Sequence, residues 1–242
     1  MGGKLIMKNK VLKGVLLSCA LGAMLVSCGA KSVTRDEAIK LLNNIAAYTI
    51  DTNTFKCKAV GVISTVDDGV TTTMTTTTNV DVANSYYHVS LVMENSGTKL
   101  TTESYSYLDG ENIVTVVSIL GQNSKTEKAG TAADWLSTNQ TNITSISSMS
   151  ATFATSLSAG LAELDTQTDA TVTTEKHTSS GDGNLSAELA ATITEDDATT
   201  SINETFTFDG NLITSVKTSG DADSNLNYTF DYKNVDTSKY SA

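Results

Sequence analysis

The chain has 242 residues with 27 acidic and 16 basic side chains, which gives a formal net charge of −11 at pH 7. Binding to nucleic acid needs clustered lysine and arginine, and this charge would repel phosphate groups, so we expect no nucleic-acid partner. The length suffices for one large domain with a hydrophobic core, or for two small ones, and we expect one.

The N-terminal segment looks like an export signal. An apolar run over residues 11–26 follows Lys4, Lys8, Lys10 and Lys13 and leads into Leu25-Val26-Ser27-Cys28. A positively charged start, a short apolar core and a small residue at the cleavage position are typical of signal peptides. The ending resembles the lipobox of bacterial lipoproteins. The resemblance implies a signal peptide over residues 1–27, a diacylated Cys28 that anchors the protein on the outer side of the membrane, and a lipidated tether over residues 28–33.

Two other interpretations of this segment stay open. It could be an ordinary secretory signal or an uncleaved membrane helix, although residues 11–26 fall short of the roughly 20 apolar residues that a spanning helix needs. Translation could start at Met1 or at Met7, and neither start changes the argument.

The three cysteines do not allow an intramolecular disulfide in a processed lipoprotein. Cys19 leaves with the signal and Cys28 carries the lipid, so Cys57 remains alone. Cys57 alternates with Phe55 and Ala59, and we expect it to be a buried small apolar residue rather than a nucleophile. The absence of proline fits long regular strands.

The first half of the chain predicts one helix and five strands. Thr34-Arg35-Asp36-Glu37 forms a capping box, and apolar residues at helical spacing continue to Tyr48. Alternating residues then predict strands that form an antiparallel meander, with Met74 pointing inward. These strands cover Phe55–Ile63, Val70–Val80, Tyr87–Met93, Lys99–Leu108 and Ile113–Leu120, and the first two are joined by a turn at Asp67-Asp68-Gly69.

The middle of the chain predicts a break in the sheet. Residues 121–130 are expected to form a polar loop, and residues 131–137 a short helix that contains Trp135. A longer helix is expected over Ile143–Leu164, with an apolar stripe that packs on the inner face of the meander. The stripe consists of Ile143, Ile146, Met149, Phe153, Leu157, Leu161 and Leu164.

Strands resume in the last third of the chain. They are expected at Thr171–His177, Leu185–Ile193, Ile202–Phe208, Leu212–Val216 and Leu226–Tyr232. The predicted fold is therefore α+β: a curved antiparallel sheet of about nine or ten strands, a half-barrel, wrapped around an N-terminal helix and a central helical insertion. We expect it to form a single domain over residues 34–242.

This order of elements, together with the lipobox, resembles the LolA/LolB and LppX/LprG lipoprotein carriers. In that family an incomplete barrel surrounds helices, and an apolar cavity between them holds lipid. The resemblance extends from the helix at Thr34 to the last strand, which ends near Lys233. It implies a lipid or another hydrophobic small molecule as ligand.

The candidate ligand site lies between the central helix and the sheet. Its expected lining is Met149, Phe153, Leu157, Leu161, Leu189, Phe206, Tyr228 and Phe230. Tyrosine hydroxyls at its mouth could orient a head group. Small residues either leave room for a ligand or let the helix approach the sheet closely; these are Ala59, Gly61, Ala187 and Ala191 on the strands and Ala159 and Gly160 on the helix.

The sequence contains few groups for catalysis. His88 and His177 are the only histidines, and both are expected to be solvated. Glu195-Asp196-Asp197 and Asp221-x-Asp223 could hold calcium weakly, but acidic turns in an acidic protein explain them better. We therefore expect no enzyme activity, no cofactor and no metal.

The expected partners are the membrane, through the lipid on Cys28, and a lipid or hydrophobic small molecule. The alternative is a surface lipoprotein with a fully packed core, whose outer strand faces contact a protein or the cell wall.

Overall fold

The computed structural model describes residues 30–67, 69–166, 170–195, 198–220 and 224–240, with the backbone alone for residues 67, 193–195, 198 and 224. The predicted signal peptide, Cys28 and the two acidic turns at residues 195–197 and 221–223 lie outside the described side chains. No helix in the described ranges is long and apolar enough to cross a membrane.

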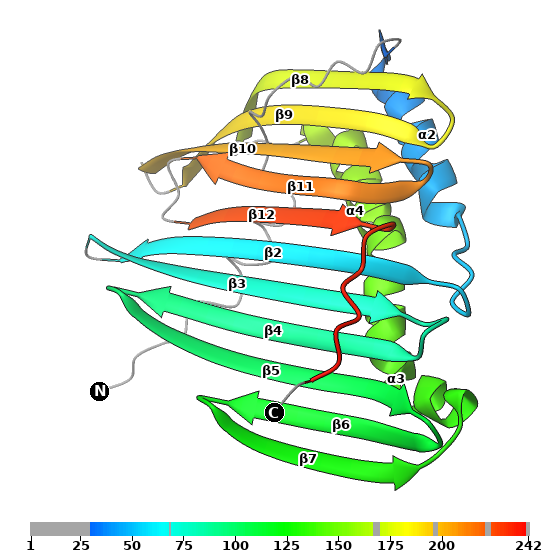
Figure 1. The fold of residues 1–242 in the computed structure, drawn as a ribbon. Coiled ribbons are helices and arrows are strands. Elements are labelled where there is room, and N and C mark those ends of the chain that lie inside the picture. The colour runs from blue at the N-terminus through cyan, green and yellow to red at the C-terminus, as the bar shows by residue number, and fades with distance from the viewer. Residues whose placement is uncertain (1–29, 68, 167–169, 196–197, 221–223, 241–242) are drawn as a thin grey trace, which may run out of the picture. The chain divides into compact units, whose positions relative to one another are not determined.

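The chain divides into two compact units, each built from segments distant in sequence. Unit 1 comprises the chain up to Tyr48 together with Ser150–Ala222, and unit 2 comprises Thr49–Met149 and the chain from Asp223 onward. Both units combine antiparallel strands with helices, which confirms the predicted α+β class (Figure 1).

Unit 1 contains five strands in the order β1-β8-β9-β10-β11. The strands are β1 (Lys31–Ser32), β8 (Ala170–Gly181), β9 (Asn184–Glu195), β10 (Ala198–Asp209) and β11 (Leu212–Gly220). Its helices are α2 (Arg35–Ala47), α4 (Met149–Glu163) and the short 3-10 helix Leu164–Thr166. The capping box begins α2 as predicted, because the Thr34 side chain accepts from the Glu37 backbone N–H while the Glu37 carboxylate accepts from the Thr34 N–H.

Packing of α2 follows from its apolar spacing. Ala38, Leu42 and Ile45 are fully buried, and the helix packs on β8 and β9. Ser158 of α4 donates a 2.9 Å hydrogen bond to Asn43 of α2, so the two helices of this unit contact each other.

Unit 2 contains seven strands in the order β12-β2-β3-β4-β5-β6-β7 and the helix α3 (Ala132–Ser147). The strands are β2 (Lys56–Asp67), β3 (Val70–Asp81), β4 (Tyr86–Asn95), β5 (Thr98–Asp109), β6 (Asn112–Ile119), β7 (Gln122–Ala129) and β12 (Ser224–Asp231). From β2 to β7 the strands form a continuous meander of hairpins, as short turns between antiparallel neighbours require.

Helix α3 packs on one face of these strands, which we call the inner face of unit 2. Trp135 and Ile143 of the helix are fully buried. The Asn139 side chain donates a 3.0 Å hydrogen bond to the Ser106 hydroxyl of β5, which fixes the helix to this face. The cross-strand register places Tyr87 and Val80 beside Ser106 on the same face, whereas Tyr86, Tyr105 and Tyr107 point to the opposite, outer face.

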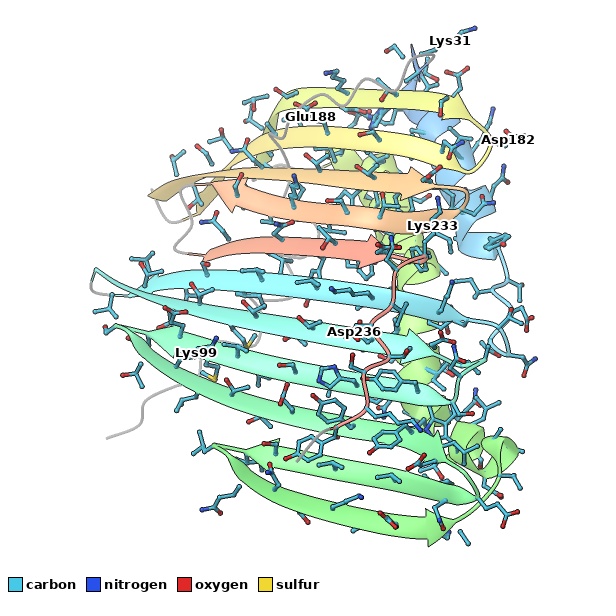
Figure 2. The ribbon with its side chains drawn as sticks, viewed as in Figure 1. Lys31, Lys99, Asp182, Glu188, Lys233 and Asp236 are labelled. Carbon is cyan, nitrogen blue, oxygen red and sulfur yellow. The ribbon has the colours of Figure 1, made fainter. Side chains whose placement is uncertain are left out.

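The C-terminal segment after β12 covers part of that outer face. It crosses in front of the cyan and green strands in Figure 1, and Figure 2 places Asp236 over them. The Tyr86 hydroxyl donates a 2.8 Å hydrogen bond to the Ser238 carbonyl, and the Tyr240 ring meets the Tyr105 ring edge-on at 5.6 Å. The segment helps to bury a cluster on this face made of Tyr86, Tyr107, Val114 and Val116.

Several predicted elements need correction. The predicted number of nine or ten strands is too low, because the described chain has twelve. The expected polar loop at residues 121–130 is strand β7, and residues 31–32 of the expected tether pair with β8 as β1. The long helix expected over Ile143–Leu164 is two helices that meet at Ser148, and the short one around Trp135 is the start of α3. The prediction of a single domain over residues 34–242 stays a prediction.

Candidate functional site

In unit 1, two predicted lining residues face each other. The ring of Phe153 on α4 lies 6.1 Å from the ring of Phe206 on β10, at an interplanar angle of 52°. Phe206 is buried, whereas Phe153 is only partly buried. The pair therefore forms an apolar contact between helix and strand in which one ring remains partly accessible to solvent.

The buried stripe of α4 differs from the predicted one. It contains Leu157 and Leu161, as predicted, but also Ser150, Ala154 and Ser158. The buried serines make hydrogen bonds to neighbouring elements. The Ser150 hydroxyl accepts a 2.9 Å hydrogen bond from the Ile213 backbone N–H of β11. Because the break at Ser148 starts a new helix, the phase of the predicted stripe is lost, and Met149 is only partly buried.

The sheet face next to Phe206 combines apolar and acidic side chains. Leu189 of β9 lies opposite Glu175 of β8 on one side and Glu204 of β10 on the other. Glu204 is buried and accepts a 3.2 Å hydrogen bond from the hydroxyl of Thr218, which is its cross-strand partner on β11. A ligand beside Leu189 would therefore meet carboxylates as well as hydrocarbon, which disfavours an anionic group at that point.

Arg35 of α2 neutralises one of these carboxylates. Its Nε and Nη2 donate to the two oxygens of Glu175 at 2.8 and 2.5 Å, and its Nη1 donates to Asp165 at 2.7 Å. The hydrogen bonds from Arg35 hold the pKa of Glu175 below its ordinary value, and the same pair raises the pKa of Arg35. These hydrogen bonds connect the first turn of α2 to β8.

His177 is buried, which corrects the expectation that it is solvated. It is 4% exposed, and its Nε2 has no hydrogen-bond partner in the described part of the chain. Glu175 Oε1 lies 3.7 Å from this nitrogen. Burial lowers the pKa of His177 and outweighs the opposite effect of Glu175, so the imidazole is neutral at pH 7.

In unit 2, the remaining lining residues stack on one another. The rings of Tyr228 and Phe230 on β12 lie 6.1 Å apart at 20°, and Phe230 is buried. Tyr228 lies over Gly61, where a Cβ atom would come within 2.2 Å of the ring. The room that the sequence analysis assigned to Gly61 is therefore filled by this ring.

The other small residues are distributed unevenly. Ala59, Ala187 and Ala191 are buried on their strands, as expected. On α4, in contrast, Ala159 is exposed and Gly160 is half-buried, so they do not form a small-residue surface toward the strands.

One row of the inner face of unit 2 is apolar across five strands. In register, Leu226 of β12, Ile63 of β2, Met74 of β3, Met93 of β4 and Leu100 of β5 lie side by side. The predicted inward direction of Met74 is confirmed. All five remain at least partly exposed, and Met93 and Leu100 are exposed by 41% and 47%. The sequence analysis did not assign this row to the site. Each of the five residues belongs to the alternating apolar pattern of its own strand, but only the pairing of the strands shows that they form a row.

His88 also departs from expectation, because it is half-buried on the outer face. Its ring stacks on the Tyr105 ring at 4.1 Å, and its Nε2 lies 3.6 Å from Glu103. Burial lowers the pKa of His88 despite this carboxylate. Cys57 is fully buried as predicted, and desolvation raises the pKa of its thiol to about 12, so a thiolate is not available at neutral pH.

The described residues contain no group of three or more histidine, cysteine, aspartate or glutamate side chains that could hold a metal ion. Neither models of protein families nor curated proteins match this chain.

Proposed function

We propose that this protein is a membrane-anchored lipoprotein that acts outside the cytoplasm and holds the apolar part of a lipid, or of another hydrophobic molecule, without catalysis. The observation that carries this proposal is the Phe153–Phe206 contact, in which one of the two rings remains partly accessible. Covering such rings with hydrocarbon is favourable by about 25 cal/mol per Å² of apolar surface removed from water.

Two further features support an apolar ligand. The row from Leu226 to Leu100 in unit 2 offers a second partly exposed apolar surface, on the face that α3 also covers. The carboxylates beside Leu189 favour a ligand whose head group is neutral or carries a hydrogen-bond donor.

Titration of the full chain with a fluorescent neutral lipid tests ligand binding. Phe153→Asp should weaken binding tenfold or more, because it removes the ring and places a charge where hydrocarbon should lie. Ala159→Asp is the matched control, since it adds the same charge at an exposed position of α4 and should leave the affinity unchanged. Equal affinities for the two variants, or no saturable binding by the unmodified chain, would exclude this site.

Palmitate labelling in a bacterial host tests the anchor. Cys28→Ser should abolish incorporation of label and release the protein from the membrane fraction. Cys57→Ser is the control, because Cys57 is fully buried and should not affect labelling. Label that persists in Cys28→Ser would place the modification elsewhere and contradict the proposed anchor.

One observation favours the alternative of a surface lipoprotein with a packed core. The Tyr228 ring occupies the space next to Gly61, so a position expected to leave room is filled. In that case no lipid would co-purify with the protein, and mass spectrometry under native conditions would detect the chain alone.

A further inference from the structure

One edge of the unit 2 sheet, strand β7, is open along its whole length. β7 pairs with β6 from end to end without a bulge, and no other described strand pairs with it (Figure 1). All eight of its residues are exposed. The strand contains no proline, so its outward N–H and C=O groups form an unbroken row that can bond to another strand.

The hairpin between β6 and β7 determines which backbone groups point outward. Ile119 and Gln122 pair across a two-residue turn, so the Gln122 N–H points toward β6. The Gly130 N–H donates to the Glu111 carbonyl and therefore points the same way. These directions alternate along an antiparallel ladder. The residues that direct their backbone groups away from β6 are therefore Asn123, Lys125, Glu127 and Ala129.

The charges on β7 fit a second copy of the same strand in one register. A two-fold axis at Thr126 places Lys125 of each copy directly opposite Glu127 of the other. Both residues direct their N–H and C=O groups away from β6, so the backbone hydrogen bonds form in the same pairing. An axis at Lys125 would instead oppose two lysines, and an axis at Glu127 would oppose two glutamates.

This register also removes the usual obstacle to edge pairing. Lysine on an edge strand disfavours pairing with another strand, because it meets no opposite charge there. Lys125 already forms a 2.7 Å ion pair with Glu127 of its own strand, and each side chain is about half exposed. With the axis at Thr126, the two ion pairs lie side by side with their charges alternating, so each lysine gains a second carboxylate neighbour.

The surroundings of β7 are less acidic than the chain as a whole. The net charge of −11 drives two copies of the chain apart. β7 carries two lysines and one glutamate, and its neighbour β6 carries no charged residue. Two copies that meet at β7 therefore approach through a weakly basic edge, where this repulsion is reduced.

We propose that two copies of this protein associate through β7, in antiparallel register centred on Thr126, and join their unit 2 sheets edge to edge. In this register, residues 123–129 of one copy pair with residues 129–123 of the other. The inference goes beyond the proposed function and depends on neither the lipid anchor nor the ligand.

Cysteine cross-linking in the full chain, solubilised in a neutral detergent, tests the register. In Thr126→Cys the two new side chains face each other across the axis with Cβ atoms about 4.5 Å apart, so mild oxidation should link most of the protein into dimers. Ser124→Cys is the matched control, because this position is equally exposed but its two copies lie about 13 Å apart along the strands. The unmodified chain gives the background from its native cysteines.

Charge reversal tests the pairing without a cross-link. In sedimentation of the full chain in the same detergent, Lys125→Glu should weaken dimerisation at least about tenfold, because it opposes two carboxylates twice. Adding Glu127→Lys to this variant restores opposite charges and should restore the dimer. Lys128→Glu is the matched control, because it makes the same charge change opposite Ser124 and should leave the dimer intact.

Three results would overturn the proposal. An unmodified chain that stays monomeric at every concentration would show that the edge does not pair. Equal cross-linking of Thr126→Cys and Ser124→Cys would indicate random collision or another register. A dimer that Lys125→Glu leaves unchanged, or that Glu127→Lys fails to restore, would place the contact elsewhere or with a different partner. All substituted positions are exposed, and unchanged Trp135 fluorescence would confirm that each variant is folded.

Discussion

Arg35, at the start of α2, binds Glu175 of β8 through two hydrogen bonds of matching geometry as well as through opposite charge. Its guanidinium donates to both oxygens of Glu175, and both side chains are largely shielded from water. Arg35→Lys keeps the charge but loses the two-pronged contact, so we expect the free energy of unfolding of unit 1 to fall by about 1–2 kcal/mol. Chemical denaturation followed by circular dichroism measures this loss, and Lys40→Arg, on the exposed side of α2, should leave stability unchanged.

His177 should make unit 1 sensitive to mild acid. Because burial lowers its pKa in the folded state, the unfolded chain binds a proton below about pH 6.5 before the folded chain does. Stability is therefore fully present above that pH and is lost as the pH falls toward the lower folded-state pKa. Glu175, whose pKa is also lowered, adds its own loss only below the ordinary range of glutamate.

Hydrogen exchange of β8 and β9 amides between pH 7.5 and 5.5, corrected for intrinsic rates, tests this prediction. Protection should decrease with pH in the unmodified chain and stay nearly constant in His177→Leu, which replaces the imidazole with a neutral side chain at a buried position. Identical pH dependence in both would assign the acid sensitivity to another group.

At the scale of elements, β2 and β12 pack closely at Gly61, because the Tyr228 ring of β12 lies directly over this glycine of β2. A Cβ atom there would meet three atoms of the Tyr228 ring within 3 Å, so Gly61→Ala should destabilise unit 2 by about 1–3 kcal/mol. Tyr228→Ser in the same chain should remove most of this penalty, because it empties the space. Urea denaturation of the four chains of this double-mutant cycle, followed by Trp135 fluorescence, measures the coupling; additive effects would mean that the ring moves aside freely.

The elements that the sequence predicted correctly are those with an apolar period. The helix after Thr34 and strands β2 to β6 all alternate or repeat apolar residues, and the structure places them within a few residues of their expected ends. Strand β7 was missed because residues 122–129 are exposed throughout and polar, so β7 is recognisable only from its backbone pairing with β6. The helix break at Ser148 was missed because the apolar spacing continues through it.

At the candidate site, the sequence pattern could not predict where the individual side chains point. Period alone identified Phe153 and Phe206 as helix and strand partners, but it could not place the Tyr228 ring over Gly61. His177 lies on β8, on which α2 packs, and this packing joins segments about 140 residues apart, so no local sequence pattern could predict the burial of His177. Likewise, His88 was correctly assigned to the face opposite the apolar one, but its ring stacks on Tyr105, which the C-terminal residue Tyr240 contacts in turn.

At the scale of the whole molecule, the last residues of the chain complete a face built by residues far earlier in the sequence. Lys239 reaches Asp109 at 2.8 Å and lies 5.4 Å above the Tyr107 ring, while Ser238 accepts the hydrogen bond from Tyr86. Residues 238–240 therefore cover part of the outer face of unit 2. Removing the segment would expose aromatic and aliphatic side chains of β4, β5 and β6 to water.

Deletion of residues 235–242 should consequently lower the free energy of unfolding of unit 2 by about 2–4 kcal/mol, from lost apolar burial and from the loss of the partly buried Tyr86–Ser238 hydrogen bond. Tyr86→Phe separates these contributions, because it removes only the hydroxyl that donates to Ser238 and should cost about 1 kcal/mol. Urea denaturation followed by Trp135 fluorescence reports on unit 2 alone, since the only tryptophan of the chain is buried there. If the deletion cost no more than Tyr86→Phe, neither the aromatic contacts of Lys239 and Tyr240 nor the Lys239–Asp109 ion pair would contribute to stability, and the Tyr86–Ser238 hydrogen bond would account for the whole effect.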